Sequence, residues 1–169
     1  MYSIRPSSNS DYRTIKKWVS NKYEYVRFAG NCVAYPFHRK DWIPKRSEAD
    51  RRRIGFCKKG ILIGYCEFTR IDSVNKSARL IRFIIDPLER SKGLGLVFLR
   101  QVIRSAFSDM NLNRIDLVVF EDNQKAIQLY MKTGFQKEGT MKEARFVEGE
   151  FRNLILMRLL KREYGYRNE

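Results

Sequence analysis

The sequence predicts an α/β fold with α+β character, in which a mixed central sheet of about seven strands carries helices on both faces. Along the chain, the spacing of apolar residues changes several times between the period of strands and that of helices. The length of 169 residues suits one sheet-centred unit, so we expect residues 1–169 to form a single domain. With 43% hydrophobic and 31% charged residues, the composition is that of a folded globular chain.

The first third of the chain gives the weakest pattern. We expect a short strand around Ile4 and a helix over 10–20, with apolar residues on one face. Residues 21–38 are aromatic and interrupted by glycine and proline, so they are predicted to be irregular. The polar stretch 39–53 is predicted to be helical in part.

Strands follow in the middle of the chain. Two β-rich runs, 54–58 and 61–70, are separated by Lys59-Gly60, a dipeptide suited to a hairpin turn. A further strand over 78–85 ends at Asp86-Pro87, because proline has no N–H to donate to a neighbouring strand.

Helices and strands alternate in the second half. The apolar residues of 93–108 recur at three- and four-residue spacing, which predicts a helix with one buried face. The remaining elements are predicted as a strand over 114–120, a helix over 123–132, a short strand near Phe135 and a last strand over 154–160.

Several classes of protein are disfavoured. No apolar run approaches the ~20 residues needed to cross a bilayer, and the N-terminus lacks the apolar core of a signal peptide. We therefore expect a cytoplasmic protein with no membrane partner. Cys32, Cys57 and Cys66 show no metal-ligand spacing, which predicts buried reduced thiols and no metal site.

The chain is strongly basic, with 34 Lys and Arg against 19 acids and a formal net charge of +15. The positive electrostatic field of such a chain attracts anions, including nucleic acid, ribosomes and phosphorylated cofactors. The basic residues are scattered, however, and neither a helix-turn-helix nor an RNA-binding aromatic strand is evident. Sequence-specific binding of nucleic acid is therefore not expected.

The connection between the strand ending at Ile85 and the next helix carries the sequence Arg90-Ser91-Lys92-Gly93-Leu94-Gly95. A helix start offers unpaired N–H groups and a positive dipole end, and glycine lets a ligand approach the backbone closely. The spacing is neither that of a nucleoside triphosphate loop nor that of a dinucleotide fingerprint. The segment is therefore either a pyrophosphate cradle of another kind or only a tight connection.

Three segments together resemble one known family. Arg90 to Gly95 is similar to the acetyl-coenzyme A signature Arg/Gln-x-x-Gly-x-Gly/Ala of the GNAT family of N-acetyltransferases. Residues 123–135 are similar to N-x-x-A-x-x-L-Y-x-x-x-G-F, from the branch that includes ribosomal-protein alanine acetyltransferases and amino-sugar acetyltransferases. Residues 146–151 match F-x-x-G-x-Y/F more loosely, and Asn153 stands where aspartate is usual in that pattern.

The resemblance implies a mostly antiparallel sheet in which two strands splay apart to hold acetyl-CoA, the cosubstrate. In the family, the free edge of the splayed strand pairs with the pantetheine arm, while N–H groups and cations at the helix start bind the pyrophosphate. The residues implied to bind the cofactor are Phe83, Ile84, Ile85, Arg90, Ser91, Lys92, Gly93, Leu94, Gly95, Asn123, Lys125, Tyr130 and Lys132.

The resemblance also implies a catalytic acid. Tyr130 would protonate the departing thiolate, and its alternative role is an aromatic ring packed at a sheet edge. Asn123 is either a helix N-cap or a contact to pantetheine. The general base is open between Glu67, Glu24 and a water relay, and Glu67 is equally suited to be the polar member of an alternating strand.

The acceptor is expected to be a primary amine of an amino sugar, an amino acid or an antibiotic-like molecule, or a protein N-terminus. Carboxylates in and around 20–45 are few, so a polyamine is not favoured. A non-catalytic acetyl-CoA-binding protein and a basic RNA- or ribosome-associated module remain alternatives, and a homodimer is left open. The aromatic residues expected to line an acceptor cleft are Trp18, Tyr23, Tyr25, Phe28, Tyr35, Phe37 and Trp42.

Overall fold

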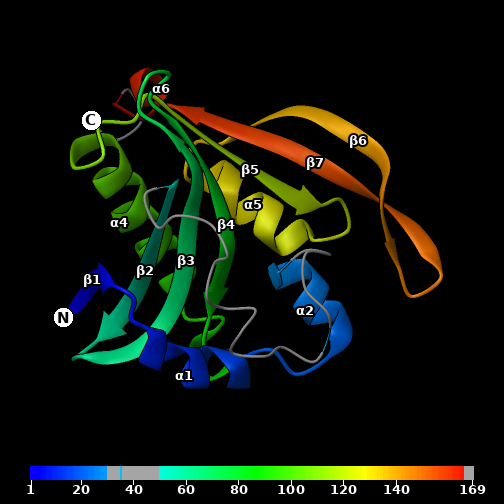
Figure 1. The fold of residues 1–169 in the computed structure, drawn as a ribbon, viewed down its shortest axis with the longest axis horizontal. Helices are drawn as coiled ribbons and strands as arrows, with labels where there is room; N and C mark the ends of the chain where they lie inside the picture. The colour runs from blue at the N-terminus through cyan, green and yellow to red at the C-terminus, as the bar shows by residue number, and fades with distance from the viewer. Residues whose placement is uncertain (30–34, 36–49, 166–169) are drawn as a thin grey trace.

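The computed structural model describes residues 1–29, 35 and 50–165, which contain one seven-stranded sheet (Figure 1). Its strands lie in the order β1-β2-β3-β4-β5-β7-β6. Neighbours are antiparallel except β4 and β5, which are parallel, so the predicted mixed and mostly antiparallel sheet is confirmed. The strands are Tyr2–Pro6 (β1), Arg51–Lys58 (β2), Ile61–Asp72 (β3), Ser77–Ile85 (β4), Arg114–Phe120 (β5), Gln136–Val147 (β6) and Glu150–Leu160 (β7).

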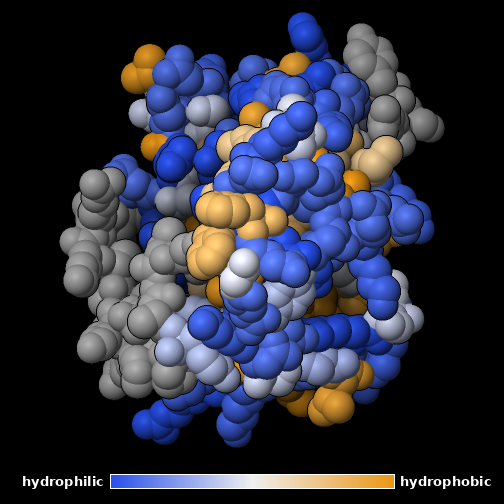
Figure 2. Space-filling model, turned by 90° about the vertical axis from the view of Figure 1, so that its right-hand side faces the viewer, coloured by the Kyte–Doolittle hydropathy of each residue, from blue (hydrophilic) through white to orange (hydrophobic). Residues whose placement is uncertain are grey.

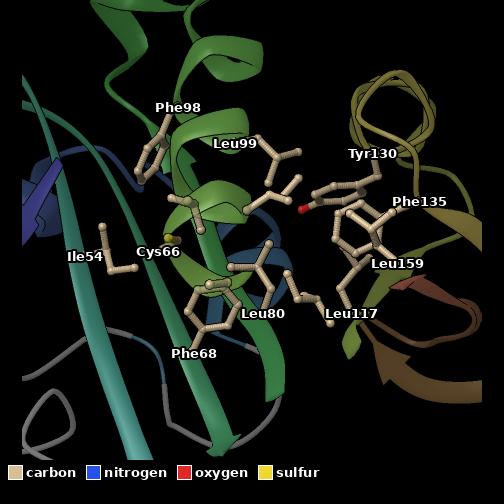
Figure 3. Close-up of a cluster of buried hydrophobic side chains, with 14 of the residues drawn as sticks. Ile54, Cys66, Phe68, Leu80, Phe98, Leu99, Leu117, Tyr130, Phe135 and Leu159 are labelled. Atoms are coloured by element: carbon tan, nitrogen blue, oxygen red, sulfur yellow. The ribbon is translucent and has the colours of Figure 1, made fainter. Parts of the chain in front are cut away.

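Helices cover both faces of the sheet, as expected. Side chains on the two faces of β3 pack against different helices. Phe68 packs with α4 and α5 on one face, whereas Tyr65 packs with α1 and α2 on the other. Figure 3 shows part of the first layer, in which Leu99 of α4 and Tyr130 of α5 lie against the sheet. The helices are Tyr12–Lys17 (α1), Lys22–Ala29 (α2), Leu94–Ser108 (α4), Gln124–Lys132 (α5) and Lys161–Gly165 (α6), with 3-10 turns at Asn9–Asp11 and Pro87–Glu89.

The parallel pair β4 and β5 separates soon after it begins. Pairing covers only Ser77 to Arg79 of β4. Beyond Arg79 the two strands diverge, and the paired residues Leu80, Ile81, Ile84 and Ile85 of β4 pair with β3 alone. The splayed pair implied by the family resemblance is therefore present, with one edge of β4 free of strand partners in the described chain.

The N-terminal region differs from the prediction in two places, the extent of the first helix and the presence of a second one. The helix expected over 10–20 is a 3-10 turn followed by α1, which ends at Lys17. Residues 22–29 form the helix α2, although the sequence around them reads as irregular. Its buried residues Tyr25 and Phe28 pack on one core cluster and Val26 on another, which stabilises a helix whose aromatic residues have modest helix propensity.

The stretch predicted over 39–53 falls mostly outside the described residues, and its end, from Arg51, belongs to β2 rather than to a helix. The short strand expected near Phe135 is the long strand β6, which pairs with β7 to form a hairpin projecting from the body (Figure 1). β7 begins at Glu150 and not at 154, and the short helix α6 was not predicted.

The hairpin has an exposed surface. Figure 2 shows this side of the molecule, where apolar groups form limited patches among hydrophilic side chains. Phe146 and Phe151 at the hairpin are 58% and 63% exposed, with ring centroids 5.0 Å apart. No helix in the described ranges has the length and apolar character needed to span a bilayer.

Candidate active site

The helix α4 begins in an unusual backbone conformation. Gly93, its N-cap, has φ +75°, and Ser91 before it has φ +62°. Glycine adopts this left-handed region at little cost, so it allows the chain to turn sharply from β4 into α4. The first N–H groups of an α-helix have no intrahelical acceptor. Those at Leu94 and Gly95 are therefore available for an anion, as the sequence predicts.

The second glycine of the motif serves packing. A Cβ on Gly95 would lie 3.3 Å from Cδ2 of Leu129, on α5. That distance is tighter than an ordinary van der Waals contact, so glycine allows α4 and α5 to approach each other. The two sequence motifs thus meet in space, because Leu129 belongs to the second of them.

A cleft of about 690 Å³ lies where β4, α4 and α5 converge with α1 and α2. Of the thirteen residues expected to bind the cofactor, Lys92 and Tyr130 do not line it. Those that do are Phe83, Ile84, Ile85, Arg90, Ser91, Gly93, Leu94, Gly95, Asn123, Lys125 and Lys132.

The charged groups at the cleft suit a polyanion. Lys125 and Lys132 on α5 line it, as does Arg27 of α2, which pairs with Asp122 at 2.8 Å. Arg90 is anchored, since its guanidinium donates to the carbonyl oxygens of Ile85 at 3.1 Å and Trp18 at 3.4 Å. These contacts hold a cation between the end of β4 and α1.

Lys92 has a different environment from that expected. Its Nζ lies 3.1 Å from a carboxylate oxygen of Glu89, which also pairs with Lys58 at 3.2 Å. Hydrogen bonds from both lysines hold the pKa of Glu89 below its ordinary value. Lys92 is therefore engaged by the 3-10 turn after β4 and does not itself line the cleft, although Glu89 does.

Tyr130 is buried between the sheet and the two cleft helices. Its ring meets those of Phe83 and Phe135 edge-on, with centroids 6.3 and 5.7 Å apart. Figure 3 shows the side chain reaching from α5 toward Leu99 of α4. Within the described chain its hydroxyl has no hydrogen-bond partner. Burial, with the nearby Cys66 as a smaller cause, raises the pKa of Tyr130 well above its usual value.

Asn123 is the N-cap of α5. Its side-chain oxygen accepts from the N–H of Ala126 at 3.4 Å, so the capping role is confirmed. Asn123 also lines the cleft. The two roles are compatible, because the amide NH₂ group is left for a ligand.

Glu67 is fully buried on β3. One carboxylate oxygen accepts from Arg82 at 2.8 Å and from the Tyr65 hydroxyl at 2.7 Å, and the other accepts from Arg51 at 2.6 Å. Glu67 does not line the cleft described above. Its role as general base stays a prediction, and its surroundings match the alternative of a polar anchor within the strand.

Glu24, the second candidate base, does line the cleft. A hydrogen bond from the Ser20 hydroxyl, with Arg90 as a further cause, lowers the pKa of Glu24. Its carboxylate lies 3.5 Å from the Arg90 guanidinium. Glu24 is thus ionised at neutral pH, but its lowered pKa makes it a weak acceptor for the proton of an amine.

The aromatic residues predicted to line an acceptor cleft differ in where they lie. Trp18 and Phe28 line the cleft, whereas Tyr25 is fully buried in the core, with the Tyr35 ring 5.7 Å away. Tyr23 points elsewhere, since its hydroxyl donates to Asp122. Phe37, Trp42 and Cys32 lie outside the described residues.

Sequence reasoning missed two arginines that surround Glu67. Arg51 belongs to the basic triplet Arg51-Arg52-Arg53, and its side chain is only 24% exposed. Arg82 is 7% exposed, in the middle of an apolar strand. A basic residue inside an otherwise apolar β run was the signal that could have identified it, because such a residue requires a buried partner.

The described cysteines are buried thiols. Cys57 and Cys66 are buried and reduced. Burial raises the pKa of Cys66 well above its ordinary value, so the thiol stays protonated. In the described ranges, no three metal-ligating side chains of the His, Cys, Asp or Glu type gather into a cluster.

Comparisons with known proteins agree with this geometry. A family model described as the acetyltransferase (GNAT) family matches residues 13–135. The chain is 28% identical over 171 residues to the spermidine N(1)-acetyltransferase of Escherichia coli strain K12, covering 95% of this chain and 87% of that protein. It is 30% identical over 145 residues to the putative ribosomal N-acetyltransferase YdaF of Bacillus subtilis strain 168, covering 83% and 79%.

A solved structure shares the fold. The spermidine N-acetyltransferase from Vibrio cholerae in complex with CoA and spermine superposes with a TM-score of 0.82. The alignment covers 96% of this chain and 97% of that one at 24% identity. The likeness therefore concerns the arrangement of helices and strands.

Proposed function

Since this chain belongs to the GNAT family and is an acetyl-CoA-dependent N-acetyltransferase, we propose that it binds acetyl-CoA in the cleft beside α4 and passes the acetyl group directly to a primary amine of a small molecule. Acetyl-CoA supplies the thioester, and the products are the acetylated amine and free CoA thiol. Binding of acetyl-CoA is a property of the family, whereas the assignment of individual residues is our proposal.

One observation carries the proposal: two motifs about 30 residues apart in the sequence lie side by side and line one cleft, at the end of a strand that has lost its parallel neighbour. A tight turn serving only to connect β4 and α4 would need neither the second motif beside it nor the free edge. The cleft of about 690 Å³ is in the range of small-molecule and cofactor sites.

The groups around the cleft fit the parts of CoA. Free N–H groups at Leu94 and Gly95 suit a pyrophosphate, and Lys125 and Lys132 suit the remaining phosphate charge. The backbone of 83–85 offers N–H and C=O groups to the amides of the pantetheine arm, as an edge strand does to an added strand. A backbone N–H here would also stabilise negative charge on the reacting carbonyl oxygen.

Tyr130 is proposed as the acid that protonates the departing sulfur. The phenol is protonated at neutral pH, as a proton donor must be. Tyr130 does not itself line the cleft, but its ring contacts that of Phe83, which does, so the proposed acid lies next to the cofactor site. Neither Cys57 nor Cys66 lines the cleft, which supports transfer without a covalent enzyme intermediate.

The acceptor is proposed to be a small primary amine. Relatives that act on spermidine make a polyamine the first compound to test. The described charges favour it less, because Glu24 is paired with Arg90 and the cations Arg27, Lys125 and Lys132 also line the cleft. An amino sugar, an amino acid or a peptide N-terminus therefore belongs in the same panel.

The proposal is tested by measuring release of free thiol from acetyl-CoA with each acceptor. We expect saturable release with at least one small amine, together with mass-spectrometric detection of the acetylated product. An enzyme that binds acetyl-CoA but acetylates none of the panel would support the non-catalytic alternative. RNA binding that falls steeply with salt, in a chain that does not bind acetyl-CoA, would support the basic module.

The organisation of the active protein is also a proposal. We propose that residues 1–169 act as a single domain in the cytoplasm and that the chain forms a homodimer. The exposed phenylalanines of the β6–β7 hairpin support self-association, and residues 136–152 balance four basic with four acidic side chains in a chain of net charge +15. Light scattering after gel filtration tests the oligomeric state, and a monomer at working concentration would contradict it.

A further inference from the structure

The pairing of β3 with β4 is interrupted beside the cleft. Between the pair Tyr65–Ile84 and the pair Glu67–Ile81, one residue of β3 lies opposite two residues of β4, which makes a β-bulge. Arg82, inside the bulge, has φ +55°. A residue with a side chain adopts this left-handed conformation at an energetic cost, and it persists only where the surroundings hold it.

The bulge determines which β4 side chains face the cleft helices. In an unbroken strand every second residue shares a face, so Leu80 would share its face with Ile84. In the structure Leu80, Phe83 and Ile85 pack with the cluster around α4, and Ile84 packs with the cluster around α1 and α2. The bulge therefore places Phe83 against Tyr130, with ring centroids 6.3 Å apart.

A buried ion pair holds the strained residue. The Nη1 atom of Arg82 lies 2.8 Å from Oε1 of Glu67, and the two side chains are 7% and 0% exposed. Glu67 is itself held by Arg51 at 2.6 Å and by Tyr65 at 2.7 Å. Through Glu67 on β3, Arg82 is therefore linked to Arg51 on β2. Removing one partner of a buried ion pair is strongly destabilising, because it leaves the other charge uncompensated.

We propose that Glu67 is a positioning residue: through Arg82 it fixes the β4 bulge, which presents residues 83–85 to acetyl-CoA and sets Phe83 beside Tyr130. The proposal rests on the acetyltransferase function proposed above. Both carboxylate oxygens of Glu67 already accept hydrogen bonds from side chains of the protein. Such a carboxylate is suited to holding its neighbours in place rather than to accepting a proton from a substrate. The proton of the incoming amine goes elsewhere, to Glu24 or to water.

The test compares two variants of the ion pair with a matched control. Arg82→Gln and Glu67→Gln each remove the ion pair, and each is expected to weaken CoA binding about tenfold, as the loss of one or two backbone hydrogen bonds would. The double variant is expected to bind CoA no more weakly than whichever single variant has the lower CoA affinity, because the two substitutions remove the same interaction. Arg114→Gln removes a different arginine–carboxylate pair, Arg114–Glu138 at 2.6 Å, and is expected to bind CoA as the wild type does.

Calorimetry with CoA alone and the pH profile of kcat/KM give the readouts. If Glu67 were the catalytic base, Glu67→Gln would bind CoA normally but lose the acidic limb of the pH profile of kcat/KM. Arg82→Gln would keep that limb. This result would overturn the proposal. Partial recovery of CoA affinity in Arg82→Lys, which retains the positive charge, would support it.

Thermal melting of each variant checks that it is folded. Should Glu67→Gln fail to fold, Arg82→Gln alone decides, because it leaves Glu67 with Arg51 and Tyr65. Normal CoA binding by folded Arg82→Gln would overturn the positioning role and leave the proposed function intact. Absence of CoA binding by the wild type would instead count against the proposed function.

Discussion

The ring of Phe83, on the splayed strand β4, meets the ring of Tyr130, on α5, edge-on at a centroid distance of 6.3 Å. This contact joins the strand proposed to align the pantetheine arm with the residue proposed to protonate its sulfur. The orientation of Tyr130 thus depends on the conformation of β4.

Replacing Tyr130 with phenylalanine removes the hydroxyl and keeps the aromatic packing. We expect kcat to fall by about a hundredfold or more, the usual contribution of a general acid. CoA binding is expected to change little, because the ring contacts remain. Tyr2→Phe, on β1, is the control, since Tyr2 stacks on Phe56 outside the cleft. Unchanged kcat in Tyr130→Phe would exclude this residue as the acid.

Gly93→Ala tests the turn before α4. Nothing lies within 4 Å of the added Cβ, but φ is +75°, so alanine is strained at a cost of about 1–2 kcal/mol in the free energy of unfolding. We expect CoA to bind about fivefold more weakly, because one backbone hydrogen bond is lost or misaligned.

Gly60→Ala is a matched control for that variant. Gly60 also has open space around it and φ +82°, but it lies in the β2–β3 turn. Chemical denaturation should show a similar loss of stability in both variants, and only Gly93→Ala should bind CoA more weakly. Equal CoA affinity in the two would contradict a role for the α4 turn in binding.

The lysines near the cleft are expected to differ. Lys132→Gln should weaken CoA binding by up to about fivefold, a typical value for an exposed charge pair, and the loss should diminish at high salt. Lys92→Gln should leave CoA affinity unchanged, because Lys92 pairs with Glu89 and does not line the cleft. Calorimetric titrations at two salt concentrations distinguish them, and a larger effect at Lys92 would contradict the described orientation.

Asp11→Asn tests an ion pair that supports the N-terminal layer. Burial disfavours the Asp11 carboxylate, but hydrogen bonds from Arg5, the Ser8 N–H and Ser7 outweigh it and lower the pKa of Asp11 from 3.8 to about 2. Because this pKa is depressed in the folded state, the stabilisation is present above about pH 4 and is lost as the pH falls toward 2.

We expect Asp11→Asn to lose about 1–2 kcal/mol at pH 7, since the exposed part of Arg5 is screened by solvent. Urea denaturation at pH 7, 4 and 2.5 should show the difference from wild type shrinking as the pH falls. A difference that stays constant over this range would mean that the carboxylate charge is not responsible.

The second half of the fold could be predicted closely because its signals are local. The apolar spacing of 94–108, the glycines before it and the Asn123 cap each act within a few residues, and α4, β5 and α5 lie at or within one residue of their predicted bounds. The cleft residues followed from two motifs whose spacing is fixed by those same elements.

The missed features depend on contacts distant in sequence. β6 has few buried side chains, so no apolar alternation marks it, and its pairing with β7 holds it in place. The helix α2 is stabilised by packing against two core clusters. The β4 bulge and the burial of Arg82 are set by Glu67 on another strand, so no local pattern shows them.

Amide hydrogen exchange with and without CoA tests the proposed binding mode most directly. At saturating CoA, exchange should slow in peptides covering 83–95 and 123–132 and stay unchanged in β1 and β6, because the backbone of β4 and the start of α4 would donate to the ligand. Saturable binding that leaves 83–95 unprotected, or no binding at millimolar CoA, would contradict the claim that these amides hold the cosubstrate.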